Sequence, residues 1–264
     1  MAQAALHFDD SAAYERFMGR WSRAVAPIFL DWLGARRCAS WLDVGCGTGI
    51  LAETLLELCA PASVHAVDPA PAQVQAAARG PAAGRATFQI ADARKLPFPG
   101  ASFDVVASAL VINFIADRPP ALAEMRRVAR PGGLVGAYVW DFVPELSPSG
   151  PLRRAMRRFG VEVPGIPGTE ASRPDALLRL FQGAALEQIE TRTIDVCLAY
   201  ADFQDFWQAQ TPGYAPTTKI IAAMKEGERA RLMRAVQSAL PSGPNGSIEY
   251  CARANAIKAR VPGA

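Results

Sequence analysis

The sequence predicts an α/β protein with a doubly wound, mostly parallel sheet and helices on both faces. Apolar runs of strand length alternate with helical stretches through the first 140 residues, and a glycine-rich turn follows the first run. The chain has 264 residues, half of them apolar, which is enough to bury one large core. We therefore expect a single domain over residues 1–264.

The elements of this core can be placed in order along the chain. Strands are predicted at residues 39–45, 63–68, 86–90, 103–108 and 134–140. Helices are predicted at residues 49–59, 71–79 and 119–129. Pro71 suits the first turn of a helix, because that turn does not use the backbone donor that proline lacks. The run Arg130-Pro131-Gly132-Gly133 is typical of a helix end followed by a turn.

The segments on either side of this core also have readable patterns. Residues 12–33 form an amphipathic helical stretch, which usually packs on a core. After residue 140 the chain becomes rich in proline and glycine. Beyond it we expect a helix at 173–181, a strand at 186–198, two or more helices within 202–240 and a last strand at 247–260.

The glycine turn predicts a nucleotide-like ligand. Gly45, Gly47 and Gly49 let the backbone approach a ligand closely, and Asp68 closes the next strand, where an acid can accept hydrogen bonds from ribose hydroxyls. A dinucleotide turn has the spacing G-x-G-x-x-G, whereas the spacing here is G-x-G-x-G with Ile50 next. No lysine or hydroxyl residue follows as in a phosphate-binding P-loop. A nucleoside cofactor without phosphates fits better.

With Asp43 two residues before the first glycine, the turn resembles motif I of the class I S-adenosylmethionine-dependent methyltransferases. Val67-Asp68-Pro69 resembles their second motif and Ala91-Asp92-Ala93 the next. The resemblance continues, in the same order as in the family, at residues 103–106 and 127–133. The order and spacing are similar to those of the branch that includes the quinone-biosynthesis methyltransferases and many other small-molecule enzymes. The resemblance implies seven strands with an antiparallel last pair, an N-terminal lid at 1–38, a cofactor-binding core at 39–140, and a substrate cap from 141–184 and 199–246.

The resemblance also implies roles for individual residues, and each has a simpler alternative. Asp68 would bind the ribose hydroxyls, or it would cap a helix. Asp92 would accept the adenine amino group beside the Ala93 backbone, or it would close an Asx-turn. Asp43 would order the glycine turn or reach the amino group of the methionine part, or it would be a buried acid bonded to backbone donors. Ser108 would lie near the reacting methyl, or it would be a plain strand end.

The N-terminal stretch adds lid candidates, for which core packing is the alternative. Tyr14 and Trp21 would cover the cofactor, and Arg20 would pair with its carboxylate. The complete set of predicted cofactor-binding residues is Tyr14, Arg20, Trp21, Asp43, Gly45, Cys46, Gly47, Asp68, Pro69, Asp92, Ala93 and Ser108.

The implied reaction is methyl transfer from S-adenosyl-L-methionine to a small-molecule acceptor by in-line displacement, leaving S-adenosyl-L-homocysteine. Such a reaction depends mainly on alignment and exclusion of water. The sequence assigns no catalytic residue: His7 lies near the terminus, and His65 is expected to pack within a strand. Two other hypotheses remain open, a protein that binds S-adenosylmethionine without transferring methyl and an NAD-dependent oxidoreductase.

The composition and the missing motifs argue against several classes of partner. The net charge of +3 is diffuse, the N/D-P-P-Y/F signature of nucleic-acid amino-methylating enzymes is absent, and no apolar run reaches the length of a membrane span. We expect a cytoplasmic protein without nucleic-acid, membrane or metal partners, in an undetermined oligomeric state. The densest basic cluster is expected to be a solvated helix face; it comprises Arg153, Arg154, Arg157 and Arg158. The five cysteines are expected to be buried free thiols; they are Cys38, Cys46, Cys59, Cys197 and Cys251.

Overall fold

A computed structural model describes residues 11–243 and 245–263. Within them, seven strands form one sheet in the order β3-β2-β1-β4-β5-β7-β6. The strands are β1 (Ser40–Val44), β2 (Ser63–Asp68), β3 (Thr87–Ile90), β4 (Phe103–Ala109), β5 (Ala129–Trp140), β6 (Glu187–Tyr200) and β7 (Ile248–Arg260). The first five strands are mutually parallel, whereas β7 runs antiparallel to β5 and β6 antiparallel to β7. The predicted fold class is confirmed.

The helices alternate with the strands as predicted. They are α1 (Ser11–Tyr14), the π-helical turn η1 (Glu15–Gly19), α2 (Arg20–Leu33), α3 (Ile50–Leu58), α4 (Pro71–Ala77), α5 (Arg118–Val128), α6 (Gly150–Arg158), the 3₁₀ turn η2 (Thr169–Ser172), α7 (Pro174–Gly183), α8 (Phe203–Gln210), α9 (Pro216–Ala223) and α10 (Glu226–Ser238). Each predicted strand and helix has an observed counterpart. His7 lies outside the described residues.

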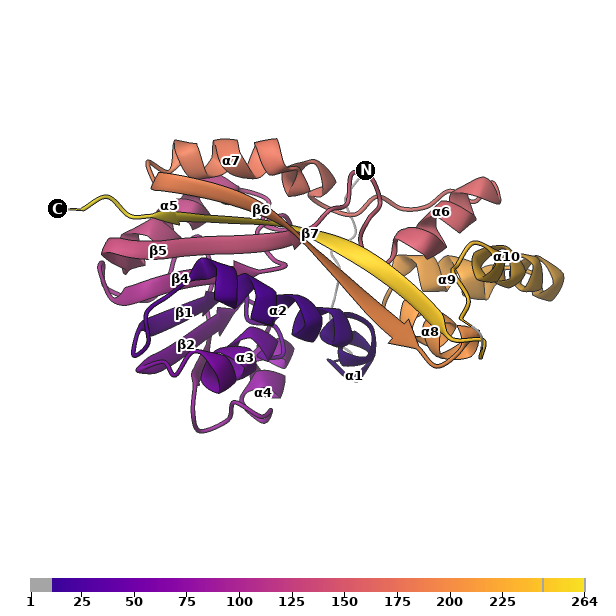
Figure 1. The fold of residues 1–264 in the computed structure, drawn as a ribbon, viewed down its shortest axis with the longest axis horizontal. Helices are drawn as coiled ribbons and strands as arrows, with labels where there is room; N and C mark the ends of the chain where they lie inside the picture. The colour runs from indigo at the N-terminus through magenta and orange to yellow at the C-terminus, as the bar shows by residue number, and fades with distance from the viewer. Residues whose placement is uncertain (1–10, 244, 264) are drawn as a thin grey trace.

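Helices cover both faces of the sheet. Figure 1 shows α5 and α7 on one face and α2, α3 and α4 on the other. Helix α2 packs closely on β5, because a Cβ added at Gly136 would lie 2.8 Å from Leu33 and 3.2 Å from Phe29. His65 packs edge-on against the Phe98 and Phe103 rings, as expected for a histidine within a strand.

The turn predicted at residues 130–133 lies inside a strand. The segment is part of β5 instead of preceding it. The Gly132 N–H donates to the Val261 carbonyl at 3.0 Å, and the Val261 N–H donates to the Gly133 carbonyl at 2.9 Å. Gly132 has a positive φ of 73°, and the pairing of β4 with β5 shifts register across this segment. The chain therefore does turn here, as a bulge within β5 that hydrogen bonds with the end of β7 hold in place.

Strands β6 and β7 form a long arm that extends beyond β5. Residues 254–260 of β7 pair with β5, whereas residues 248–253 pair with β6 alone. Figure 1 shows the arm curving away from the sheet toward α8, α9 and α10. The arm thus joins the sheet to a group of helices that follow β5 and β6 in the sequence. We call this group, which consists of α6, α8, α9 and α10, the cap.

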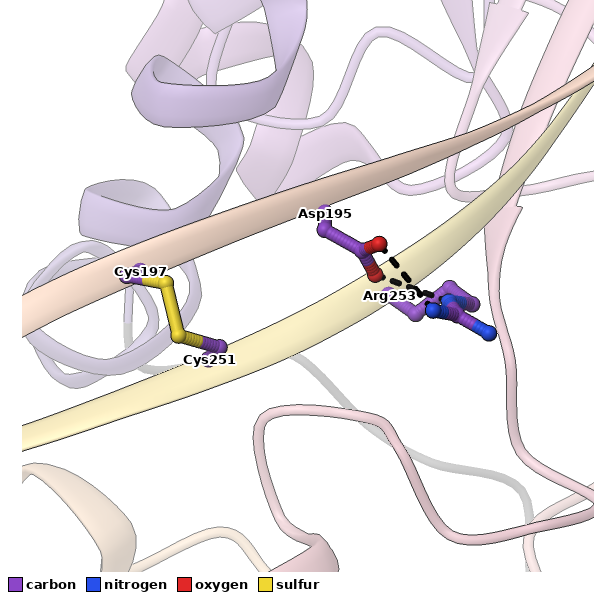
Figure 2. The surroundings of a disulfide bond; sticks show 4 residues. All are labelled: Asp195, Cys197, Cys251 and Arg253. Atoms are coloured by element: carbon purple, nitrogen blue, oxygen red, sulfur yellow. Dashed lines mark hydrogen bonds and ion pairs between the residues drawn. A yellow bond between two sulfur atoms is a disulfide. The ribbon is translucent and has the colours of Figure 1, made fainter. Parts of the chain in front are cut away.

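The arm also carries a disulfide, so two of the cysteine predictions were wrong. Cys197 and Cys251 are exactly opposed residues of β6 and β7, and their sulfur atoms are bonded, as Figure 2 shows. The ion pair of Asp195 with Arg253 lies beside them. The two cysteines are 54 residues apart in the sequence and belong to no C-x-x-C motif, so only the pairing of β6 with β7 brings their thiols together. The remaining cysteines of the described chain are free, but Cys38 is exposed and Cys59 half-buried rather than buried.

None of the helices in the described part of the chain is long and apolar enough to cross a membrane.

Candidate active site

The glycine turn leaves β1 at the carboxyl edge of the sheet. The amides of Gly45 and Cys46 both donate to the Val67 carbonyl of β2, at 2.7 and 2.9 Å. Gly45 has a φ of 82°, and a Cβ there would lie 2.5 Å from the Val111 side chain. Gly47 has a φ of 52°, and a Cβ there would meet nothing within 4 Å. The turn is therefore tightly packed at Gly45 and open at Gly47, where a ligand can approach the backbone.

Asp68 connects this turn to the end of β2. One carboxylate oxygen accepts from the Gly47 amide at 3.0 Å and the other from the Ala70 amide at 2.9 Å. Burial raises the pKa of Asp68, while these two backbone donors act in the opposite direction. The carboxylate lines the cavity described below, so its remaining lone pairs are available to a ligand.

Asp43 is a buried acid whose carboxylate oxygens are unsatisfied in the described structure. Its side chain is fully buried, and neither carboxylate oxygen has a hydrogen-bond partner among the described residues. Burial, and to a lesser extent the charge of Asp68, raises the pKa of Asp43 to about 8. A buried acid without a partner is costly unless a ligand supplies a donor. Asp43 lines the same cavity as Asp68.

A cavity of about 800 Å³ opens beside these residues. Its walls come from the glycine turn, the N-terminal helices, the ends of β4 and β5, and the cap. The residues that line it are mainly apolar and aromatic, and the charged ones are Asp43, Asp68 and Arg153. Its size and lining suit a nucleoside cofactor together with a small second molecule.

The N-terminal segment is fastened to the glycine turn. The Thr48 hydroxyl donates to the Glu15 carboxylate, which also accepts from Arg23 at 2.6 Å. Tyr14 lines the cavity with Phe17 and Met18 of the following turn. Tyr14 thus lies where a lid residue is predicted.

The two other lid predictions have different surroundings. Trp21 is fully buried in the core, with edge-on contacts to Trp140 and Tyr250 at ring distances of 6.0 and 5.8 Å. Arg20 donates to the Asp205 carboxylate at 3.2 Å and to the Ala199 carbonyl at 2.8 Å. Neither residue lines the cavity, because Trp21 packs against β5 and β7 while Arg20 is paired with α8 and the end of β6.

Three further predicted site residues also lie outside the cavity lining. Asp92 is exposed and accepts from the Arg94 amide at 2.8 Å and from its guanidinium at 2.6 Å, which is the Asx-turn alternative. Its neighbour Ala93 is not part of the lining either. Ser108 is fully buried, and the lining is formed instead by the residues after it, Ala109 and Leu110.

The remaining predicted residues do line the cavity. They are Tyr14, Asp43, Gly45, Cys46, Gly47, Asp68 and Pro69. Cys46 is buried, and burial with the nearby charges of Asp43 and Asp68 raises the pKa of its thiol. The thiol therefore stays protonated, in agreement with a packing role.

The cap contributes residues that no sequence motif indicated. Arg153 was expected on a solvated face, but it is only 7% exposed and lines the cavity. Gln210 is 2% exposed and lines the same space, near Tyr214 and Thr217. A helix with four arginines gives no local signal for which one faces inward, because that depends on how the cap folds over the sheet.

Comparisons with known proteins find methyltransferases similar to this chain. The methyltransferase domain family matches residues 42–136. The malonyl-[acyl-carrier protein] O-methyltransferase of Halorhodospira halophila is 43% identical over 131 residues, which are 48% of this chain and 44% of that protein. The demethylmenaquinone methyltransferase of Deinococcus radiodurans is 32% identical over 181 residues, which are 66% of this chain and 73% of that protein.

A solved structure shows the same fold. Phosphoethanolamine N-methyltransferase 2 of Haemonchus contortus, in complex with S-adenosyl-L-methionine, has a TM-score of 0.58 at 17% identity, covering 98% of this chain and 59% of that one. The match to the Halorhodospira relative spans less than half of that protein. The Deinococcus relative is covered over nearly three quarters of its length, and the matched family domain contains the glycine turn and Asp68. The chain belongs to the S-adenosylmethionine-dependent methyltransferases.

Proposed function

We propose that this protein transfers a methyl group from S-adenosyl-L-methionine to a small-molecule acceptor by in-line displacement. The proposal depends on one observation: Asp43 is a fully buried acid beside an open glycine turn, and no described residue forms a hydrogen bond with its carboxylate. The donor has an ammonium group that would satisfy this carboxylate. The residues present therefore fit this cofactor.

Each part of the donor has a matching group in the cavity. Asp43 would bind the ammonium group of the methionine part, and Asp68 the ribose hydroxyls. The open space above Gly47 would take the chain that joins them. Tyr14 and Phe17 would cover the donor from the N-terminal side.

The protein's own contribution to the reaction is alignment and exclusion of water. The sulfonium of the bound cofactor supplies an activated methyl group. The apolar lining holds the acceptor in line with that methyl and keeps water away from it. Tyr138 also lines the cavity, and burial together with Asp43 raises the pKa of its phenol, which therefore acts as a hydrogen-bond donor and not as a base.

The cap is the acceptor side of the site in this proposal. We assign residues 1–38 to the lid, 39–140 to donor binding, and 141–184 with 199–246 to acceptor binding. Support comes from the cavity lining after β5, which includes Phe142, Ile166 and Tyr214. These side chains suit an apolar or aromatic acceptor.

Calorimetry with S-adenosylmethionine, S-adenosylhomocysteine and NAD tests the donor assignment. We expect binding of the first two, and loss of at least about tenfold in affinity in Asp43→Asn, because an ionic hydrogen bond is lost. Asp31→Asn is the matched control, since Asp31 is exposed on α2. NAD binding without a response to the sulfonium compound would refute the proposal. A methyl-transfer assay on a metabolite panel then separates an enzyme from a non-catalytic binding protein, which would bind the donor but leave every acceptor unmodified.

A further inference from the structure

The cap end of the cavity holds two polar side chains that are more than nine-tenths buried. Arg153 of α6 is 7% exposed and Gln210 at the end of α8 is 2% exposed, and both line the cavity. Helix α6 and helix α8 are separate in sequence, so only the folded cap brings these two residues to one space. Neither residue has a role in donor binding as described above.

The hydrogen-bonding capacity of Arg153 is largely unused. One terminal nitrogen, Nη2, donates to the Pro164 carbonyl at 2.6 Å. The Nε atom lies 3.9 Å from the Glu145 carboxylate, which is contacted more closely by Arg157. For Nη1 the described residues provide no hydrogen-bond acceptor within bonding distance. Burial lowers the pKa of Arg153, so the charge is desolvated.

Gln210 is also unsatisfied. Neither its amide oxygen nor its amide nitrogen reaches hydrogen-bonding geometry with a described residue. The Tyr200 hydroxyl lies close to it and is likewise without a well-formed hydrogen bond. A buried amide donor and an incompletely paired guanidinium that line the same cavity are suited to a ligand with several acceptor oxygens.

The charges of the cavity are divided between its two ends. The acids Asp43 and Asp68 lie at the glycine turn, and Arg153 is the basic residue among those that line the cavity. Figure 1 shows α6 in the cap beside α9 and α10, away from α3 and α4, which follow the glycine turn and β2. The positive charge therefore lies on the acceptor side.

We propose that the acceptor carries a carboxylate, which Arg153 and Gln210 bind at the cap end of the cavity. This inference rests on the proposed methyl transfer and specifies its substrate class: an apolar or aromatic carboxylic acid. A guanidinium presents paired N–H groups that match the two oxygens of a carboxylate. The apolar side chains of Phe142 and Ile166 would hold the remainder of the acceptor. Arg153 is thus a positioning residue for the acceptor.

Matched acids and amides test the proposal. With S-adenosylhomocysteine bound, phenylacetate and octanoate are each compared with phenylacetamide and octanamide by calorimetry and saturation-transfer NMR. We expect at least one acid to bind about tenfold more tightly than its amide, since a hydrogen bond to a charged group is involved. Arg153→Met should abolish this preference while S-adenosylhomocysteine affinity stays within about twofold.

Controls make the result specific to this arginine. Arg158→Met removes an exposed arginine from the same helix and should keep the preference. If Arg153→Met does not fold, the same comparison of acids and amides is made with Gln210→Leu. In this variant the acid should bind about threefold or more weakly than to the unaltered protein, while the affinity for the amide stays unchanged.

Equal binding of acids and amides to the unaltered protein would overturn the inference. So would a loss of S-adenosylhomocysteine binding in folded Arg153→Met, because Arg153 would then bind the donor. Failure of the unaltered protein to bind S-adenosylhomocysteine would instead overturn the proposed function, and this inference with it.

Discussion

Replacing Asp43 with Asn is expected to make the unliganded protein more stable and the liganded complex weaker. Asp43 is buried and has no hydrogen-bond partner in the part of the chain that the structure describes, and its pKa is raised to about 8 by burial and by Asp68. Asparagine has nearly the same shape as a protonated aspartate but has no proton to lose. The substitution therefore removes the free-energy cost of keeping this acid protonated at neutral pH, and it also removes the carboxylate that would pair with an ammonium group.

The size of the stability effect follows from the pKa difference. The unfolded chain loses this proton near pH 4, whereas the native protein keeps it up to about pH 8. Between these values the native state binds more protons, so the free energy of unfolding of the unaltered protein falls as pH rises. At pH 7 this corresponds to roughly 4 kcal/mol, as an upper limit for a fully buried group. Asp43→Asn should not lose stability in this way as pH rises. The difference in free energy of unfolding between the variant and the unaltered protein should therefore disappear near pH 4.

Two measurements check this reasoning. Urea unfolding of both proteins at pH 5, 6, 7 and 8 should show the two stabilities diverging by up to about 1.4 kcal/mol per pH unit. Calorimetry should show that S-adenosylhomocysteine binds the unaltered protein more tightly as pH rises toward 8, and that Asp43→Asn loses both affinity and this pH dependence. A variant that is less stable at pH 7 and binds S-adenosylhomocysteine normally would refute the assignment of Asp43 as a binding residue.

Three further substitutions test other parts of the site and the arm. Asp68→Ala should weaken S-adenosylhomocysteine binding and cost only about 1–2 kcal/mol of stability, because it removes two hydrogen bonds to backbone amides. Gly45→Ala should cost about 3 kcal/mol, since its Cβ would lie against Val111, whereas Gly47→Ala should cost about 1 kcal/mol and mainly impair binding. Replacing Cys197 and Cys251 together with serine should lower stability by about 2–4 kcal/mol, because the disulfide closes a loop across a separation of 54 residues.

Each of these predictions has a result that would contradict it. Unchanged affinity in Asp68→Ala would remove that carboxylate from the binding site. Equal stability of the two glycine variants in urea unfolding would show that the turn is not held by contact with Val111. The double serine variant should bind S-adenosylhomocysteine normally, because the disulfide lies in the arm and not in the cavity lining. A thermal midpoint equal to that of the oxidised protein would mean that the bond does not form in solution.

The sequence predicted the parallel core because each of its elements is encoded locally. The apolar runs at 39–45 and 63–68 are buried strands. The glycines between β1 and α3 have positive φ values, as their spacing in the sequence suggested. Asp43 and Asp68 follow from the same logic, because parallel strands place their carboxyl ends at one edge of the sheet.

Sequence alone could not decide contacts between distant segments. The Cys197–Cys251 disulfide depends on the register of β6 with β7, and the inclusion of residues 130–133 in β5 depends on hydrogen bonds with Val261. Arg20 pairs with Asp205, which is 185 residues away in the sequence, and does not line the cavity.

The proposed donor end of the site is therefore determined by the sequence, because one turn and two neighbouring strand ends build it. The proposed acceptor end was decided only by the tertiary structure. Arg153 and Gln210 lie in different helices with no motif around them, and they reach one cavity because the β6–β7 arm carries the cap over the edge of the sheet.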